Sequence, residues 1–196
     1  MERVPSLTID RGTGLADGAT LLLSPNRDAR PPGATVDLIV IHGISLPPGG
    51  YAGAEVEAFF QNRLDMTRHP YYATIEALRV SAHFYVRRDG RLVQFVPVHE
   101  RAWHAGVSVY GARDACNDFA VGIELEGTDE EPYDERQYPV LAALVVALRR
   151  AYPTLAEDAL AGHSDIAPTR KTDPGPHFDW ARLGRAVTAL TAPARA

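Results

Sequence analysis

The longest unbroken apolar run in the first third of the chain lies in residues 34–43, ATVDLIVIHG. Leu38 to Ile41 follow one another without a polar residue, which is typical of a strand covered on both faces. The run ends at His42, so we expect this imidazole at the end of a strand. The next segment, ISLPPGGYAG, contains two prolines and three glycines and predicts a loop.

A hairpin is predicted further along, in VSAHFYVRRDGRLVQFV. Every second residue from Val80 to Val86 is apolar, which is the period of a strand. Asp89-Gly90 is typical of a two-residue hairpin turn. We therefore expect two antiparallel strands on either side of this turn.

A second alternating segment, AVGIELEG at residues 120–127, carries two carboxylates. Its apolar residues share one face of the predicted strand, which leaves Glu124 and Glu126 together on the other face. The two carboxylates are then roughly 7 Å apart along the strand. This arrangement is uncommon, and periodicity alone does not distinguish one glutamate from the other.

Helical periodicity appears in three segments. Residues 54–64 predict a short helix, and residues 179–192 predict a closing helix with Asp179 as its N-cap. In residues 137–150 we place the helix start late, because Pro139 is tolerated only in a first turn. Strands and helices are thus interleaved with a hairpin, which predicts an α/β (α+β) fold: a mixed β-sheet flanked by helices.

The composition fits a single globular domain: 196 residues, of which 45% are hydrophobic and 23% charged. We expect an irregular N-terminal extension at residues 1–30 and one folded domain at residues 31–190. The first 30 residues lack the apolar core of a signal peptide, and the single Cys116 fits a reducing compartment, so both indicate the cytoplasm. With a net charge of -5 and scattered arginines, the chain predicts no nucleic-acid partner, and without a long apolar run it predicts no membrane partner.

Lys171 is the one lysine among 20 basic residues. It lies in GHSDIAPTRKTDPGP, whose prolines and glycines predict no helix, between His163 and Asp173. A compact ammonium differs most from a planar guanidinium in a chemical site. Together with His42, these side chains stand at strand ends or in a stiffened loop, where a rigid scaffold can bring metal ligands together. A lone histidine at a strand end is more often structural than a ligand, Asp173 before Pro174 is also typical of a turn cap, and the spacing of these residues matches no general motif such as HExxH.

Five longer blocks resemble the AmpD branch of the zinc-dependent N-acetylmuramoyl-L-alanine amidases. They extend from about residue 36 to residue 185 and read LIVIHGISLPPGG, LRVSAHFYVRRDGRLVQFVPVHERAWHAGVS, CNDFAVGIELEGTD, QYPVLAALVVAL and GHSDIAPTRKTDPGPHFDWARL. The resemblance implies a fold similar to that of peptidoglycan recognition proteins, with the zinc amidase catalytic domain at residues 31–190. It further implies a zinc ion (Zn²⁺) held by His42, His163 and Asp173. Glu124 and Lys171 are then the catalytic residues, and Glu126 is a supporting or surface carboxylate.

The chemistry of amide hydrolysis accounts for these residue types. Three protein ligands leave zinc an open position at which the pKa of water falls toward neutrality. Glu124 is then expected to take a proton from water and return it to the leaving amine, while Lys171 stabilises the developing oxyanion. The resemblance implies a muropeptide substrate, usually with a 1,6-anhydro sugar, cleaved between the lactyl group of N-acetylmuramic acid and L-alanine during cell-wall recycling in the cytoplasm. We expect the enzyme to act as a monomer.

Four further residues are candidates for substrate contact. Arg79 and Arg170 lie in well-matched blocks and suit the carboxylates of a stem peptide. In RAWHAG, Trp103 offers a flat apolar face to the sugar, although a core position explains it equally well, and His104 is the fourth candidate. Gly43 stands where this branch usually has asparagine, which removes a possible hydrogen-bond donor to the substrate.

Three alternatives remain open at the level of sequence. A noncatalytic muropeptide-binding module needs neither the metal ligands nor a general base. An iron(II) oxygenase also uses two histidines and a carboxylate, but leaves Glu124 and Lys171 unexplained. A broader amidase with the same residues acts on polymeric peptidoglycan instead of soluble muropeptides.

Overall fold

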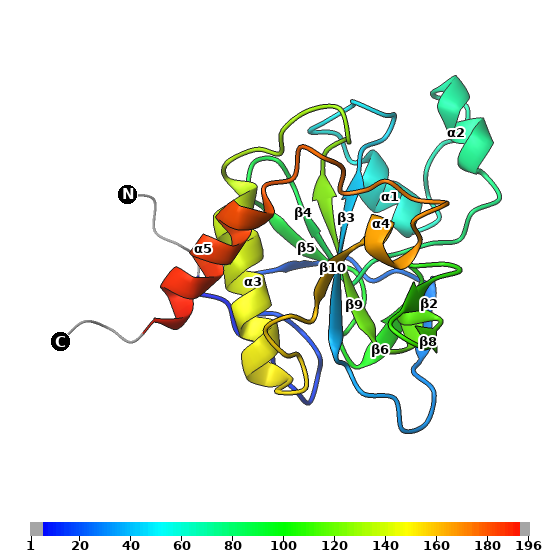
Figure 1. Cartoon of the computed structure of the whole chain (residues 1–196). Helices are drawn as coiled ribbons and strands as arrows, with labels where there is room; N and C mark the ends of the chain where they lie inside the picture. Colours follow the sequence, from blue (N-terminus) through cyan, green and yellow to red (C-terminus); the bar gives the residue numbers. More distant parts are fainter. Residues whose placement is uncertain (1–5, 193–196) are drawn as a thin grey trace.

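A six-stranded mixed sheet organises the protein in this computed structural model, which describes residues 6–192 (Figure 1). The strand order is β1-β5-β4-β9-β3-β10, and two small two-stranded sheets pair β2 with β6 and β7 with β8. The strands are β1 (Thr20–Leu21), β2 (Arg27–Ala29), β3 (Leu38–Ile44), β4 (Phe84–Val86), β5 (Leu92–Gln94), β6 (Glu100–Ala102), β7 (Val109–Tyr110), β8 (Arg113–Asp114), β9 (Ala120–Glu126) and β10 (Leu160–Gly162).

The centre of the sheet is parallel. β3 pairs with β9 on one side and with β10 on the other, and β4 also runs parallel to β9. β4 and β5 form the predicted antiparallel hairpin, with Gly90 at a φ of 83° in its turn. The predicted mixed sheet is confirmed. β3 continues two residues past His42, so this histidine lies inside the strand near its carboxyl end.

Helices cover both faces of the sheet. They are α1 (Glu55–Phe60), α2 (Pro70–Ile75), α3 (Gln137–Ala151), α4 (His163–Ile166) and α5 (Trp180–Thr191), and a 3-10 turn, η1, spans Cys116–Asp118. α3 and α5 lie together on one face and α1 lies on the other (Figure 1). No helix formed within residues 6–192 is both long and apolar enough to cross a membrane.

Two details of the helices differ from the sequence prediction. α3 begins earlier than predicted, at Gln137, so that Pro139 still falls in its first turn, where its missing N–H costs no hydrogen bond. α4 forms where we predicted no helix. The Asp165 carboxylate accepts a hydrogen bond from the Gly162 N–H (2.7 Å), which stabilises its first turn, and Pro168 limits its length to four residues.

Alternation along the central strands separates two buried layers. On one face, Ile41 of β3 and Ile123 of β9 belong to the same buried cluster as Leu144 and Leu148 of α3. On the other face, Phe60 of α1 packs with aromatic side chains of β4 and of the segment after β5. His42 of β3 and Glu124 of β9 also point to that second face, near the carboxyl ends of their strands, and they belong to the site described below.

Within the described residues, the N-terminal segment packs as part of the folded domain. We predicted an irregular extension over residues 1–30, of which residues 1–5 lie outside the described region. β1 joins the main sheet beside β5, and Leu7 and Ile9 are buried in the core. Arg30 donates hydrogen bonds to several backbone carbonyls, including those of Val98 and Ala120 (3.1 and 2.9 Å). Isolated apolar residues between glycines and prolines give no periodic signal, so this burial could not be predicted from the sequence.

Candidate metal centre and cleft

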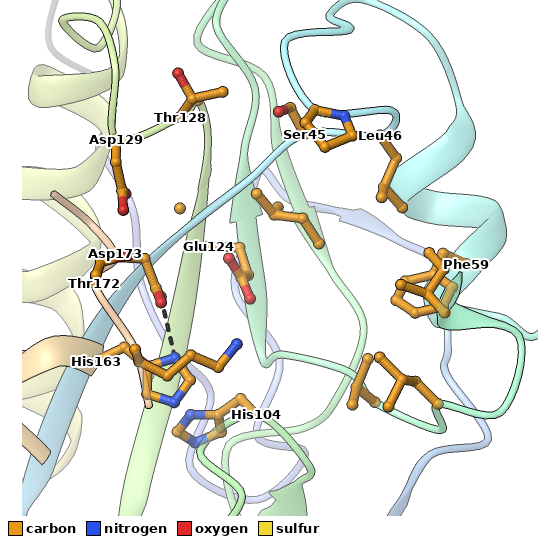
Figure 2. A pocket seen from close by; sticks show the side chains of 18 of the residues that line it. Ser45, Leu46, Phe59, His104, Glu124, Thr128, Asp129, His163, Thr172 and Asp173 are labelled. Carbon is orange, nitrogen blue, oxygen red and sulfur yellow. Dashed lines mark hydrogen bonds and ion pairs between the residues drawn. The ribbon is translucent and has the colours of Figure 1, made fainter. Parts of the chain in front are cut away.

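A cleft of about 480 Å³ opens at the carboxyl ends of the central strands. One wall is polar, with Glu124, His163 and Asp173, and the opposite wall is apolar, with Leu46 and Phe59 (Figure 2). Most of the remaining lining residues come from the end of β3 and the loops after β3 and β9, from α2 and the segment that follows it, and from the loop after α4, while Phe60 and His104 complete the lining.

Three elements bring the predicted metal ligands to the polar wall. His42 comes from β3, and His163 follows directly on β10, its parallel neighbour. Parallel strands end at the same edge of a sheet, so both imidazoles arrive at one place. Asp173 lies in the loop after α4, where its carbonyl accepts a hydrogen bond from the Ser164 N–H (2.9 Å).

The three ligand atoms form a nearly equilateral triangle. Nδ1 of His42 is 2.9 Å from Nδ1 of His163 and 3.3 Å from Oδ2 of Asp173, and the third side, from His163 Nδ1 to Asp173 Oδ2, is 3.1 Å. Tetrahedral zinc with ligands at 2.0–2.2 Å requires separations of about 3.3 Å. The arrangement therefore fits a zinc ion. Within residues 6–192, these three side chains are the group of histidine, cysteine, aspartate or glutamate residues whose ligand atoms lie close enough together to hold a metal ion.

Outward hydrogen bonds orient both imidazoles. Nε2 of His163 is 3.2 Å from the Ala105 carbonyl, and Nε2 of His42 is 2.9 Å from Nδ1 of His104. A carbonyl only accepts, so His163 carries its proton on Nε2 and keeps Nδ1 free as a ligand. If His42 likewise donates to His104, its own Nδ1 is free as well. Such outer partners hold metal-ligating histidines in place.

The protonation states suit metal binding. Burial lowers the pKa of His42 to about 4, so this imidazole is neutral at physiological pH. Burial opposes ionisation of Asp173, but the neighbouring His163 and His42 outweigh it and lower the pKa of this carboxyl. His42 as a neutral imidazole and Asp173 as a carboxylate are therefore in the states that metal binding requires.

The structure distinguishes the two glutamates of β9. Glu126 is buried, and its carboxylate accepts hydrogen bonds from the backbone N–H groups of Ala52 (2.8 Å) and Arg88 (2.9 Å). Glu124 lies opposite His42 in the strand register and lines the cleft. Its Oε2 has no hydrogen-bond partner among the described residues. The Glu126 carboxylate is thus engaged by the backbone, while the Glu124 carboxylate has an oxygen free for other contacts.

The surroundings of Glu124 favour proton binding. Burial, and then the negative charge of Asp173, raise the pKa of Glu124 well above its ordinary value, whereas Lys171 opposes the shift. A carboxylate with a raised pKa is a stronger base, which suits proton transfer near neutral pH. Lys171 is half-buried on the cleft wall, where its backbone N–H donates to the Ala167 carbonyl (2.9 Å).

The four predicted substrate contacts fall into two groups. His104 and Arg170 line the cleft, and Arg170 also donates to the carbonyls of Ala105 (2.5 Å) and Val107 (2.8 Å). Arg79 and Trp103 are outside the cleft lining. The Arg79 guanidinium donates to carbonyls of its own segment, and the Trp103 side chain interacts with Asp28. Contact of these two residues with a substrate stays a prediction.

Sequence reasoning missed two contributions to the site. The Ala105 carbonyl orients His163, but a backbone group leaves no mark in the sequence. The sequence predicts His104 as a substrate contact and not as a metal ligand, and the structure also places its Nδ1 2.9 Å from Nε2 of His42. A histidine in a well-matched block was the available signal for this role. Burial, and then the proximity of His42, lower the pKa of His104 well below its ordinary value, so its ring is neutral.

Comparison with known proteins agrees with this geometry. The family model described as N-acetylmuramoyl-L-alanine amidase matches residues 32–176. The chain is 54% identical to the 1,6-anhydro-N-acetylmuramyl-L-alanine amidase AmpD of Escherichia coli (strain K12), over 89% of this chain and 94% of the relative.

Solved structures support the same assignment. A crystal structure of a selenomethionine derivative of AmpD superposes with a TM-score of 0.88 at 51% identity, covering 92% of this chain and 99% of the other. A complex of the E. coli amidase AmiD with anhydro-N-acetylmuramic acid-L-Ala-D-gamma-Glu-L-Lys superposes with a TM-score of 0.58 at 26% identity, covering 92% and 65%. The fold, the cleft and these matches lead to one conclusion: the chain belongs to the N-acetylmuramoyl-L-alanine amidase family.

Proposed function

We propose that the protein is a zinc-dependent hydrolase of muropeptide recycling. It cleaves the amide between the lactyl group of 1,6-anhydro-N-acetylmuramic acid and the L-alanine of the stem peptide. The observation that carries the proposal is the triangle of ligand atoms 2.9–3.3 Å apart, in a cleft that also holds Glu124. The relative that is 54% identical is named for this reaction.

His42, His163 and Asp173 would hold the zinc ion. When bound there, zinc supplies a Lewis acid that lowers the pKa of water and polarises a carbonyl. The protein places two imidazoles and one carboxylate together, and it orients the imidazoles through contacts with the Ala105 carbonyl and with His104. Imidazoles that bind a metal ion are neutral. The net charge of the three side chains is then -1, which suits a divalent cation.

Glu124 acts as general base and then as general acid. Its carboxylate takes a proton from the attacking water, and the resulting carboxylic acid gives that proton to the leaving amine of L-alanine. Burial raises the pKa of Glu124, so the proton is held firmly enough for the second transfer. The unpartnered Oε2 is the atom available for this proton.

Lys171 stabilises the charge that develops on the amide oxygen. As water attacks, the carbonyl carbon becomes tetrahedral and its oxygen gains negative charge. An ammonium on the cleft wall favours this state over the neutral amide. The compact charge of lysine suits a single oxygen better than the fork of arginine, which explains why a chain otherwise devoid of lysine contains one here.

The two walls of the cleft suit the two ends of a muropeptide. Arg170 joins Lys171 as the second cation of the lining, and its guanidinium suits a stem-peptide carboxylate. His104 also lines the cleft, and its Nε2 has no hydrogen-bond partner within residues 6–192. Leu46 and Phe59 supply an apolar surface on the opposite side. We infer that the protein acts as a monomer in the cytoplasm, where a soluble anhydro-muropeptide is available.

A comparison of two substrates tests this proposal. The purified protein is incubated with a 1,6-anhydro-N-acetylmuramyl tripeptide and, separately, with intact sacculi, and the released peptides are identified by mass spectrometry. We expect rapid release of a peptide with a free L-alanine amino group from the small substrate alone. Efficient release from sacculi would favour the broader amidase, and binding without release would favour a noncatalytic module.

A further inference from the structure

Tyr133 lies behind the polar wall of the cleft. Its ring is buried and packs edge to face on Phe178, with 5.5 Å between ring centroids. Its hydroxyl donates a hydrogen bond to the carbonyl of Pro174, the residue that follows Asp173 (3.0 Å). Burial raises the pKa of Tyr133, so the hydroxyl keeps its proton, and can donate it in a hydrogen bond, at neutral pH. Tyr133 is absent from the cleft lining, so it holds the wall without touching the cleft.

The space for this hydroxyl exists because residue 43 is glycine. Gly43 directly follows the ligand His42 on β3. A Cβ atom at position 43 would overlap the Tyr133 hydroxyl oxygen, whereas the next nearest atoms are Cζ of Tyr133 at 3.3 Å and Cα of Pro174 at 3.8 Å. The tyrosine hydroxyl therefore occupies the volume that any other residue at position 43 would need for its side chain.

A second glycine brings Pro174 against the other histidine ligand. Gly162 directly precedes His163, and a Cβ atom there would approach Cδ of Pro174 to 2.9 Å. Pro174 thus packs between the backbone positions next to His42 and His163, while it is bonded to Asp173. A displacement of Pro174 would move the Asp173 carboxylate relative to both imidazoles.

We propose that Tyr133 is a positioning residue that sets the Asp173 carboxylate against the two imidazoles by holding Pro174, and that Gly43 is required to admit its hydroxyl. This inference rests on the proposed zinc site. Oδ2 of Asp173 lies within 3.3 Å of both ligand nitrogens, so a small shift of its loop changes two sides of the triangle at once. Loss of such an outer support typically weakens metal binding by about 10- to 100-fold.

The first test compares two tyrosines that share one aromatic cluster. Tyr138 also contacts Phe178, with 5.5 Å between centroids, and its hydroxyl accepts a hydrogen bond from the Asp179 N–H (2.9 Å), away from the ligands. We expect Tyr133→Phe to raise the zinc dissociation constant about tenfold in chelator competition, and Tyr138→Phe to leave it unchanged. Equal zinc affinities in the two variants would overturn the positioning role.

The second test uses the contact between Gly43 and Tyr133. Gly43→Ala alone is expected to lower the melting temperature of the zinc-free protein and to weaken zinc binding. In a Tyr133→Phe background the overlapping oxygen is gone and the nearest atom is Cζ at 3.3 Å, so the same substitution should cost much less. Additive effects of the two substitutions would refute the proposed contact.

The two tests separate this inference from the proposed function. Wild-type protein that takes up no zinc would refute the proposed metal site and the positioning role with it. Wild-type protein that binds zinc as tightly as Tyr133→Phe would refute the positioning role alone. The comparison of Gly43→Ala in the two backgrounds reads the melting temperature of zinc-free protein, so its result does not depend on the metal.

Discussion

Replacing Glu124 with glutamine removes the proposed base at constant size. The side chain is buried on β9 opposite His42, and none of its oxygens belongs to the ligand triangle. Zinc affinity should therefore change by less than about tenfold, which is the smallest loss expected when an outer partner of a metal ligand is removed. General acid–base catalysis contributes about 100- to 10,000-fold, so turnover should fall by that factor, or by about 3–5 kcal/mol of activation free energy.

The same substitution lowers turnover but should raise the stability of the zinc-free protein. Burial raises the pKa of Glu124, so the folded zinc-free protein holds this proton more tightly than the unfolded chain does. The contribution of Glu124 to stability is complete below its unfolded pKa and is lost as the pH rises through its folded pKa. At alkaline pH the wild-type fold has therefore lost this contribution, and zinc-free Glu124→Gln should melt at a higher temperature than wild type. The difference should disappear in acid.

The assay follows zinc-loaded turnover by chromatography with mass detection and measures melting of the zinc-free protein by calorimetry. Glu126→Gln is the matched control, because Glu126 lies on the same strand face and accepts hydrogen bonds from two backbone N–H groups. An amide cannot accept both in the same way, so this variant should melt lower and retain catalysis. Turnover of Glu124→Gln above about one tenth of wild type would refute the general-base role.

Four further outcomes follow from the site and the core. Asp173→Ala should lose both zinc and turnover, measured by metal analysis and activity on the same preparation. Lys171→Arg should bind zinc normally and turn over about 100-fold more slowly, since it misplaces a charge at the oxyanion, and wild-type rates would contradict this. Turnover should fall as the pH drops through the raised pKa of Glu124, because the protonated carboxyl no longer acts as a base, and the residual activity of Glu124→Gln should not show this fall. Leu144→Ala, in the fully buried core, should lose about 2–5 kcal/mol in urea unfolding, with zinc affinity retained.

The sheet and the long helices were predictable because their patterns are periodic. The alternation around Glu124 and the run ending at His42 both correspond to strands that pair in the centre of the sheet. α2 was missed, since six residues beginning at Pro70 give too few turns for a helical period. α4 was missed because its stability comes from one side-chain contact, from Asp165 to Gly162, and not from helix propensity.

The candidate site was predicted by resemblance more than by physical pattern. Periodicity placed Glu124 and Glu126 on one face and could not separate them. Their roles differ because the N–H groups of Ala52 and Arg88, far away in sequence, satisfy only Glu126. The connection from Gly43 through Tyr133 to the Asp173 loop is likewise invisible in sequence, because it depends on how two loops pack.

Removal and return of the metal provides the sharpest test of the proposed reaction. The purified protein is stripped with a chelator, and zinc is added back in steps while hydrolysis of a 1,6-anhydro-muropeptide is followed. Hydrolysis should fall to background and then rise in proportion to zinc until one ion is bound per chain. Full hydrolysis by the metal-free protein, or recovery with iron(II) and not with zinc, would contradict the proposed zinc amidase.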